Sequence, residues 1–149
     1  MTTPYNEMND EQLSALIAEQ VMGWRVQWFD RFYHNINNNN EWSQNRATSK
    51  ENCHHTPVAY WKDLEDCCLH QVDEWNPAGE DGIADAMLVV EKMRAQQFAV
   101  GLACDEDSEQ WSATFDNING PFTAEDKSLP RAICLAAIDA TTNTTAEQR

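Results

Sequence analysis

Residues 83–116 read IADAMLVVEKMRAQQFAVGLACDEDSEQWSATFD and carry the most regular patterning in the chain. Apolar residues recur at helical spacing in the first part, which predicts an amphipathic helix over Ile83–Gln97. Large and small residues then alternate over Phe98–Cys104, and apolar and polar residues alternate over Trp111–Phe115. Because a short acidic stretch separates these two runs, they are predicted to form an antiparallel hairpin.

Two further helices are predicted outside this stretch. Asn9 is a good N-cap and Gln12 stands where a capping box requires it, so one helix is expected over about residues 10–22, with Gly23 ending it in a left-handed turn. The other helix is expected over residues 129–140, with Pro130 near its first position. Four apolar residues of these patterns are expected to be buried, namely Leu16, Ile17, Leu102 and Ile133.

The remaining patterns are less regular. Trp24–Tyr33 and Val58–Trp61 read as strands, while Asp63–Val72 is open between helix and strand. His34–Thr56 contains a four-asparagine run and little apolar content, which predicts a mobile loop. Three helices around a small, mainly antiparallel sheet indicate one α+β domain over residues 1–140, with an irregular insert at about 34–75 and a flexible tail over 141–149. The pattern leaves open whether the helices cover one face of the sheet or both.

Three blocks of this sequence together are similar to a known family. They are EQLSALIAEQVMGW at Glu11–Trp24, Asn76-Pro77 followed by Ile83–Leu102, and Trp111–Phe115 followed by LPRAICLAAI at Leu129–Ile138. In order and spacing they resemble the phage ABA sandwich domain, a family of small phage and prophage proteins without an assigned role. The resemblance implies a layered α/β/α sandwich and carries no catalytic residues across. The chain departs from the family pattern between His34 and Glu74.

The charge of the chain limits its partners. Ten Lys and Arg against 25 Asp and Glu give a net charge of −15, and the basic residues are scattered singly along the sequence. Such a chain repels phosphate backbones, so no direct nucleic-acid binding is expected.

No apolar run is long enough for a membrane span, and the polar N-terminus is unlike a signal peptide. Five Cys, an odd number, fit a reducing compartment, so we expect the protein in the host cytoplasm.

Metal binding and catalysis receive little support from the sequence. All four His and three of the five Cys fall between His34 and His70. The weak metal candidates are Cys53, His55, Cys67 and His70. Their spacing differs from that of the usual zinc sites, so no metal and no cofactor are expected. The sequence contains no nucleophile elbow, P-loop or His-Glu-x-x-His motif, so it does not predict an enzyme; a small metal-dependent hydrolase remains the alternative.

The sequence favours binding as the function. The residues predicted to contact a ligand or partner are Arg31, Trp42, Arg46, Trp61, Lys62 and Trp75, with Arg25 and Lys50 as further phosphate contacts. Tryptophans of this kind commonly anchor a partner, although they can also fill space under a long loop. We therefore expect a phage accessory protein that sequesters a nucleotide-like ligand, with a site between protomers of a homo-oligomer as one arrangement. Occlusion of a host protein is the other mechanism, with mimicry of DNA by the acidic surface as a further alternative.

Overall fold

The computed structural model describes residues 5–36 and 39–147, and within it the chain forms two compact units. We call Met1–Gly23 with Trp75–Arg149 the helical unit, and Trp24–Glu74 the sheet unit. The helical unit contains η1 (Tyr5–Glu7), α1 (Asp10–Gln20), α2 (Ile83–Ala95), β5 (Ala99–Asp105), β6 (Gln110–Asp116), β7 (Phe122–Asp126) and α3 (Leu129–Glu147). The sheet unit contains β1 (Arg25–Ile36), β2 (Asn39–Ala47), η2 (Lys50–Asn52), β3 (Thr56–Lys62) and β4 (Cys68–Gln71).

Helix α1 begins and ends where its sequence signals predict. The Asn9 side chain accepts a hydrogen bond from the Gln12 backbone N–H at 2.7 Å, and the Gln12 side chain accepts one from the Asn9 backbone N–H at 3.1 Å. This capping box satisfies two backbone donors at the start of the helix. Gly23 adopts a φ of +74°, the left-handed conformation that ends the helical segment.

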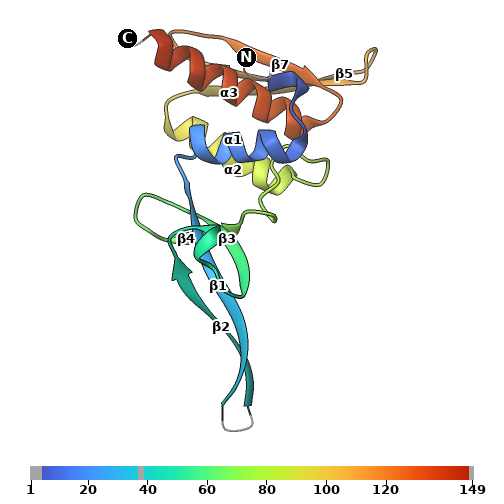
Figure 1. Cartoon of the computed structure of the whole chain (residues 1–149). Coiled ribbons are helices and arrows are strands. Elements are labelled where there is room, and N and C mark those ends of the chain that lie inside the picture. The colour runs from blue at the N-terminus through green and yellow to red at the C-terminus, as the bar shows by residue number, and fades with distance from the viewer. Residues whose placement is uncertain (1–4, 37–38, 148–149) are drawn as a thin grey trace. The chain divides into compact units, whose positions relative to one another are not determined.

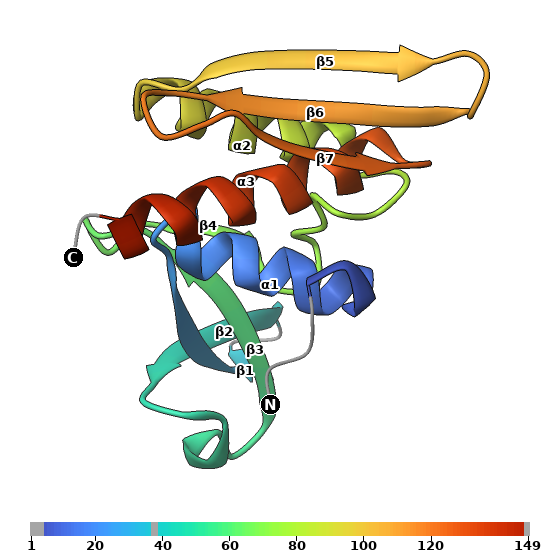
Figure 2. The same ribbon diagram turned by 90° about the horizontal axis from the view of Figure 1, so that it is seen from above.

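The helical unit is a three-stranded antiparallel sheet covered by helices. Its strand order is β5-β6-β7, so the hairpin predicted over residues 98–115 is confirmed, while β7 was not predicted. Helix α3 packs against β6 and β7, and α1 and α2 pack against α3. All three helices lie on one face of this sheet (Figures 1 and 2), which answers a question that the sequence left open.

Burial follows this arrangement. Ile17 and Ile133 are fully buried, as predicted, and Phe115 of β6 is buried with them. Leu16 is only partly buried, and Leu102 is 40% exposed, so the prediction that both lie in the core is wrong. The reason for Leu102 is that β5 is an edge strand, whereas α3 packs against the other two strands of the sheet.

Helix α3 continues to Glu147 and is therefore longer than the helix predicted over residues 129–140, while the flexibility expected from Thr141 onward stays a prediction. Adding a residue to an existing helix requires no new nucleation, and polar residues can therefore extend it. The Thr141 hydroxyl also donates to the carbonyl oxygens of Ala137 and Ile138, at 2.9 and 3.2 Å. The last two residues, 148 and 149, lie outside the described residues.

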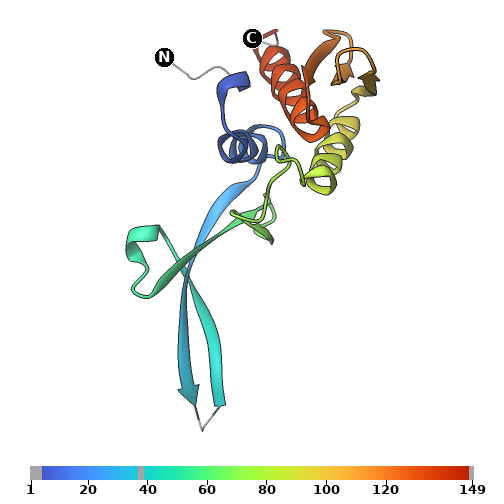
Figure 3. The same cartoon turned by 90° about the vertical axis from the view of Figure 1, so that its right-hand side faces the viewer.

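The sheet unit is a four-stranded antiparallel sheet of order β2-β1-β3-β4. Figure 3 shows β1 and β2 as a long hairpin. The prediction of an irregular loop over His34–Thr56 is therefore wrong, since β2 pairs with β1 from Ala47 to Asn39. Strand β2 could not be predicted from the sequence, because it is an edge strand and its mainly polar, exposed residues show no apolar alternation. Of the four-asparagine run, Asn37 and Asn38 lie outside the described residues.

The α+β class, the antiparallel pairing and the three α-helices are confirmed, with two sheets in place of the single one expected. The helical unit differs from the α/β/α layering that the resemblance implied, because its three helices lie on one face of its three-stranded sheet (Figures 1 and 2). Among the helices of the described ranges, none combines the length and apolar character that crossing a membrane requires.

Candidate ligand-binding face

The register of the sheet unit brings basic and aromatic residues onto one face. Side chains alternate between faces along a strand, and directly paired residues share a face. Strand β1 contributes its odd-numbered residues, and the pairs include Tyr33 with Trp42, Arg31 with Gln44 and Arg25 with Lys62. The basic-aromatic face, as we call it, comprises Arg25, Gln27, Phe29, Arg31 and Tyr33 of β1, Trp42, Gln44 and Arg46 of β2, and Thr56, Val58, Tyr60 and Lys62 of β3.

The basic residues are scattered along the sequence, but the fold gathers several of them on one face. Four of the five basic residues of the sheet unit lie on the basic-aromatic face, although they are far apart in sequence. None of the residues that β1, β2 and β3 contribute to it is acidic, because Asp30 and Glu41 occupy the opposite face by register. The face therefore concentrates positive charge in a chain whose net charge is −15.

Arg31 lies at the centre of the face with its guanidinium held in place. It donates to Gln44 Oε1 from Nη2 at 3.1 Å and from Nε at 3.3 Å. It also donates to the Tyr60 hydroxyl at 2.8 Å, and Gln71 Nε2 donates to the same hydroxyl at 3.1 Å. Both fixed contacts of Arg31 are neutral, and no carboxylate pairs with it in the described part of the chain, so its charge is oriented but not neutralised.

A hollow of about 670 Å³ lies beside this guanidinium and is lined by Arg31, Trp42, Ser43, Gln44, Thr56 and Tyr60. Trp42 is 65% exposed, and its ring centroid lies 5.0 Å from that of Tyr33, which is also exposed. An exposed indole beside a fixed cation offers a stacking surface next to an anion contact. The hollow can therefore hold a planar, negatively charged molecule.

Arg46 and Lys62 form a second basic group on the same face. Both contact Asp66 in the turn after β3, with Arg46 Nη1 at 2.7 Å from Oδ2 and Lys62 Nζ at 2.9 Å from Oδ1. The Arg46 hydrogen bond, followed by that of Lys62, lowers the pKa of the Asp66 carboxyl to about 2. Lys62 also donates to Gln27 Oε1 at 3.1 Å, which fixes its ammonium group over β1.

The other predicted site residues lie elsewhere. Trp61 is 1% exposed and belongs by register to the opposite face, and Trp75 is buried in the helical unit with its Nε1 donating to the Ser14 carbonyl oxygen at 3.0 Å. Burial favours the core alternative for these two tryptophans, while their predicted contact with a partner stays a prediction. Lys50 begins η2, outside the strands that form the face.

The weak metal candidates are dispersed over the sheet unit. The Cys53 thiol donates to the Phe29 carbonyl oxygen at 3.5 Å, and His55 pairs with Asp30 at 3.1 Å. Cys67 is exposed, and the His70 ring stacks on Trp24. Within residues 5–36 and 39–147, no three His, Cys, Asp or Glu side chains are grouped so that they could hold a metal ion.

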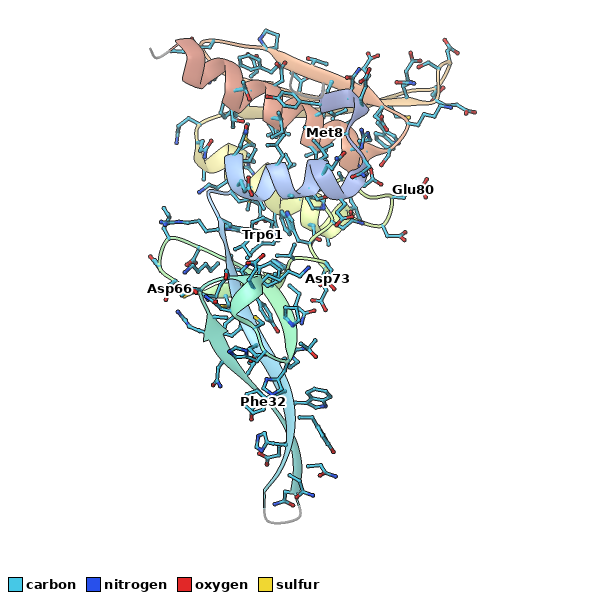
Figure 4. The ribbon with its side chains drawn as sticks, viewed as in Figure 1. Met8, Phe32, Trp61, Asp66, Asp73 and Glu80 are labelled. Atoms are coloured by element: carbon cyan, nitrogen blue, oxygen red, sulfur yellow. The ribbon has the colours of Figure 1, made fainter. Side chains whose placement is uncertain are left out.

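A second hollow, of about 560 Å³, lies in the helical unit at the start of α3. It is lined by two cations, Lys127 and Arg131, and by the carboxylates of Asp10, Glu80 and Asp126. Arg131 already contacts Asp10 at 2.9 Å and Asp126 at 3.7 Å, and also donates to the carbonyl oxygens of Asn6 and Met8. Met8 and Glu80, labelled in Figure 4, mark this end of the unit. Because the Arg131 guanidinium already pairs with two carboxylates, this hollow is less suited to an anion than the one beside Arg31.

Sequence reasoning missed Tyr33, Gln44 and Tyr60 as site residues. Tyr33 and Gln44 belong to the pairing of β1 with β2, a strand that was not predicted. Tyr60 reaches the hollow from β3, through the pairing of β3 with β1. The alternation of Arg25, Phe29 and Arg31 at odd positions of β1 was a usable signal, because it placed all three on one face.

Comparisons with known proteins agree with the architecture. The model of the phage ABA sandwich domain matches residues 15–138. A solved structure described as a phage protein from Bacillus cereus ATCC 14579 is similar with a TM-score of 0.54 and 16% identity, covering 94% of this chain and 99% of that one. At that identity the likeness concerns the fold alone. No curated protein matches the chain. Since the family model spans most of the sequence, the chain belongs to the phage ABA sandwich domain family.

Proposed function

We propose that this chain is a non-catalytic phage accessory protein that sequesters a nucleotide-like ligand on the basic-aromatic face, in the host cytoplasm and to the benefit of the phage against host defence. The observation that carries the proposal is the fixed, unneutralised guanidinium of Arg31 beside the exposed indole of Trp42. A nucleotide has the two matching parts, a flat base and an anionic phosphate.

The energetics favour a ligand with both parts. Stacking of a base on an aromatic side chain contributes about 1–3 kcal/mol. A hydrogen bond between a phosphate and a charged donor is roughly twice as strong as a neutral one. Arg31 needs no rearrangement to make such a bond, because Gln44 and Tyr60 already orient it.

Binding without chemistry is supported by the nature of the reactive groups. Burial raises the pKa of the Cys134 thiol well above its usual range, which keeps it protonated and unreactive. His34 Nε2 lies 2.5 Å from Ser43 Oγ, but in the described residues no carboxylate orients this imidazole as the third member of a catalytic triad would.

The test is a titration of the purified protein with AMP, ADP and a cyclic dinucleotide, followed by calorimetry and by quenching of tryptophan fluorescence. We expect Trp42→Ala and Arg31→Gln each to weaken binding by about 10- to 100-fold. Arg94→Gln is the matched control, since it removes one positive charge from an exposed position of α2. Absence of binding to all three probes, together with absence of any small molecule in mass spectra of protein purified from host cells, would reject the proposal.

A second candidate rests on the distribution of charge. The helical unit holds 17 acidic and five basic residues, against eight and five in the sheet unit. An acidic unit of this kind could engage a basic patch on a host protein, as a mimic of DNA does. Affinity capture from host lysate at low and high salt separates the two candidates, because only this one predicts a salt-sensitive protein partner.

A further inference from the structure

Among the described residues, Asp66 is the carboxylate that pairs with cations of the basic-aromatic face. Its two oxygens divide between two cations from different strands, Oδ2 to Arg46 and Oδ1 to Lys62. A phosphate group binds between an arginine and a lysine in the same way, with separate oxygens accepting from each. The Asp66 carboxylate thus occupies the position that a ligand anion would take.

The turn that carries Asp66 does not depend on this carboxylate. Asp63 closes the turn, since its Oδ1 accepts from the backbone N–H groups of Glu65 at 2.9 Å and Cys67 at 3.0 Å. The Asp63 backbone also donates to the Cys67 carbonyl oxygen and accepts from the Asp66 N–H. Removal of the Asp66 charge therefore leaves the hydrogen bonds of the turn in place.

The position of Asp66 also suits displacement. Its side chain is 53% exposed, and exposed ion pairs contribute little to stability. Its φ of +67° lies in the left-handed region, which is less favourable for a residue with a side chain than for glycine. A carboxylate held in this way can swing away from the face when a stronger anion arrives.

We propose that Arg46 and Lys62 form a phosphate subsite of the ligand-binding face and that Asp66 is its internal counter-anion, displaced when the ligand binds. The inference rests on the proposed function and adds the class of ligand. Trp42 and Arg46 are four residues apart on β2, which is roughly 13 Å along the strand. A nucleoside diphosphate is long enough to place its base on Trp42 and its terminal phosphate at Arg46, whereas a monophosphate is too short. Arg31 lies between these two residues.

The experiment compares Asp66→Asn with Asp73→Asn, using pyrophosphate and ADP as probes. Figure 4 labels both residues, which lie on different segments of the sheet unit. Both variants lose one negative charge from an exposed loop, but only Asp66 contacts Arg46 and Lys62. We expect Asp66→Asn to bind pyrophosphate about tenfold more tightly than wild type, with Asp73→Asn changed by less than about twofold. Adding Lys62→Gln to Asp66→Asn should abolish the gain.

Asparagine tolerates the left-handed conformation, and Asp66→Gly provides a second variant that removes the carboxylate at a position where glycine is unstrained. Equal pyrophosphate affinities for both Asp66 variants and Asp73→Asn would overturn the subsite. If that result accompanies loss of ADP binding in Trp42→Ala, the proposed function stands and this inference fails. If the Asp66 variants gain pyrophosphate affinity while Trp42→Ala leaves ADP binding unchanged, the subsite stands and nucleotide binding fails.

Discussion

Substitution of Trp61 tests whether this tryptophan belongs to the core, as its burial indicates, or to the binding site. It has the largest of the fully buried side chains in the described residues. Truncating a buried tryptophan to alanine costs about 3–5 kcal/mol. Its Nε1 has no hydrogen-bond partner in the described part of the chain, and burying an unpaired N–H costs about 1–3 kcal/mol. We therefore expect Trp61→Ala to lower the free energy of unfolding by about 3 kcal/mol, at the lower end of the range.

The unpaired N–H gives a second, independent expectation. Trp61→Phe keeps an aromatic ring in the core and removes the buried donor, so the loss of packing and the removal of the unsatisfied group oppose each other. The free energy of unfolding should then change by less than about 1 kcal/mol. Trp42→Ala, at a position that is 65% exposed, should change it by less than about 0.5 kcal/mol.

Urea denaturation followed by circular dichroism measures all three variants against wild type, with equal slopes as the check that the unfolded states are comparable. The reasoning would be refuted if Trp61→Ala unfolded at the wild-type urea concentration and at the same time lost nucleotide binding. In that case Trp61 would be an accessible anchor, as the sequence predicted.

Three further expectations follow from the same contacts. Ile133→Ala should lower the free energy of unfolding by about 2–5 kcal/mol, measured by urea denaturation, while Ile118→Ala, at a position that is 99% exposed, should leave it unchanged. The pKa of Asp66 in the folded protein is about 2, below its ordinary 3.8, so its ion pairs stabilise the fold above pH 3.8 and this contribution is lost as the pH falls through 2. Asp66→Asn lacks these ion pairs, so its urea midpoint should fall less than that of wild type between pH 3.8 and 2. Iodoacetamide at pH 8 should modify the three exposed cysteines and leave Cys134 unmodified in the native protein, as mass spectrometry of peptides can establish; modification of Cys134 at an equal rate would contradict its burial.

Local sequence signals were sufficient wherever a segment forms its structure with near neighbours. The capping box of Asn9 and the left-handed Gly23 involve residues three or fewer positions apart, and both could be predicted. The hairpin of β5 and β6 was equally predictable, because its strands alternate and only a short turn joins them. These signals also account for the resemblance to the family, whose blocks lie in the helical unit apart from the Trp24 that ends the first.

Tertiary structure alone decided the candidate site and the final extent of the core. Arg31, Arg46 and Lys62 share a face only because β1 pairs with both β2 and β3, and a shift of one residue in either register would have moved a strand's side chains to the opposite face. Trp42 and Trp61 look alike in sequence, yet one is exposed on an edge strand and the other is buried. Burial and the sharing of a face depend on residues brought together from distant segments, whereas caps, turns and alternation depend on neighbours along the chain, and only the second kind of information can be read from a single sequence.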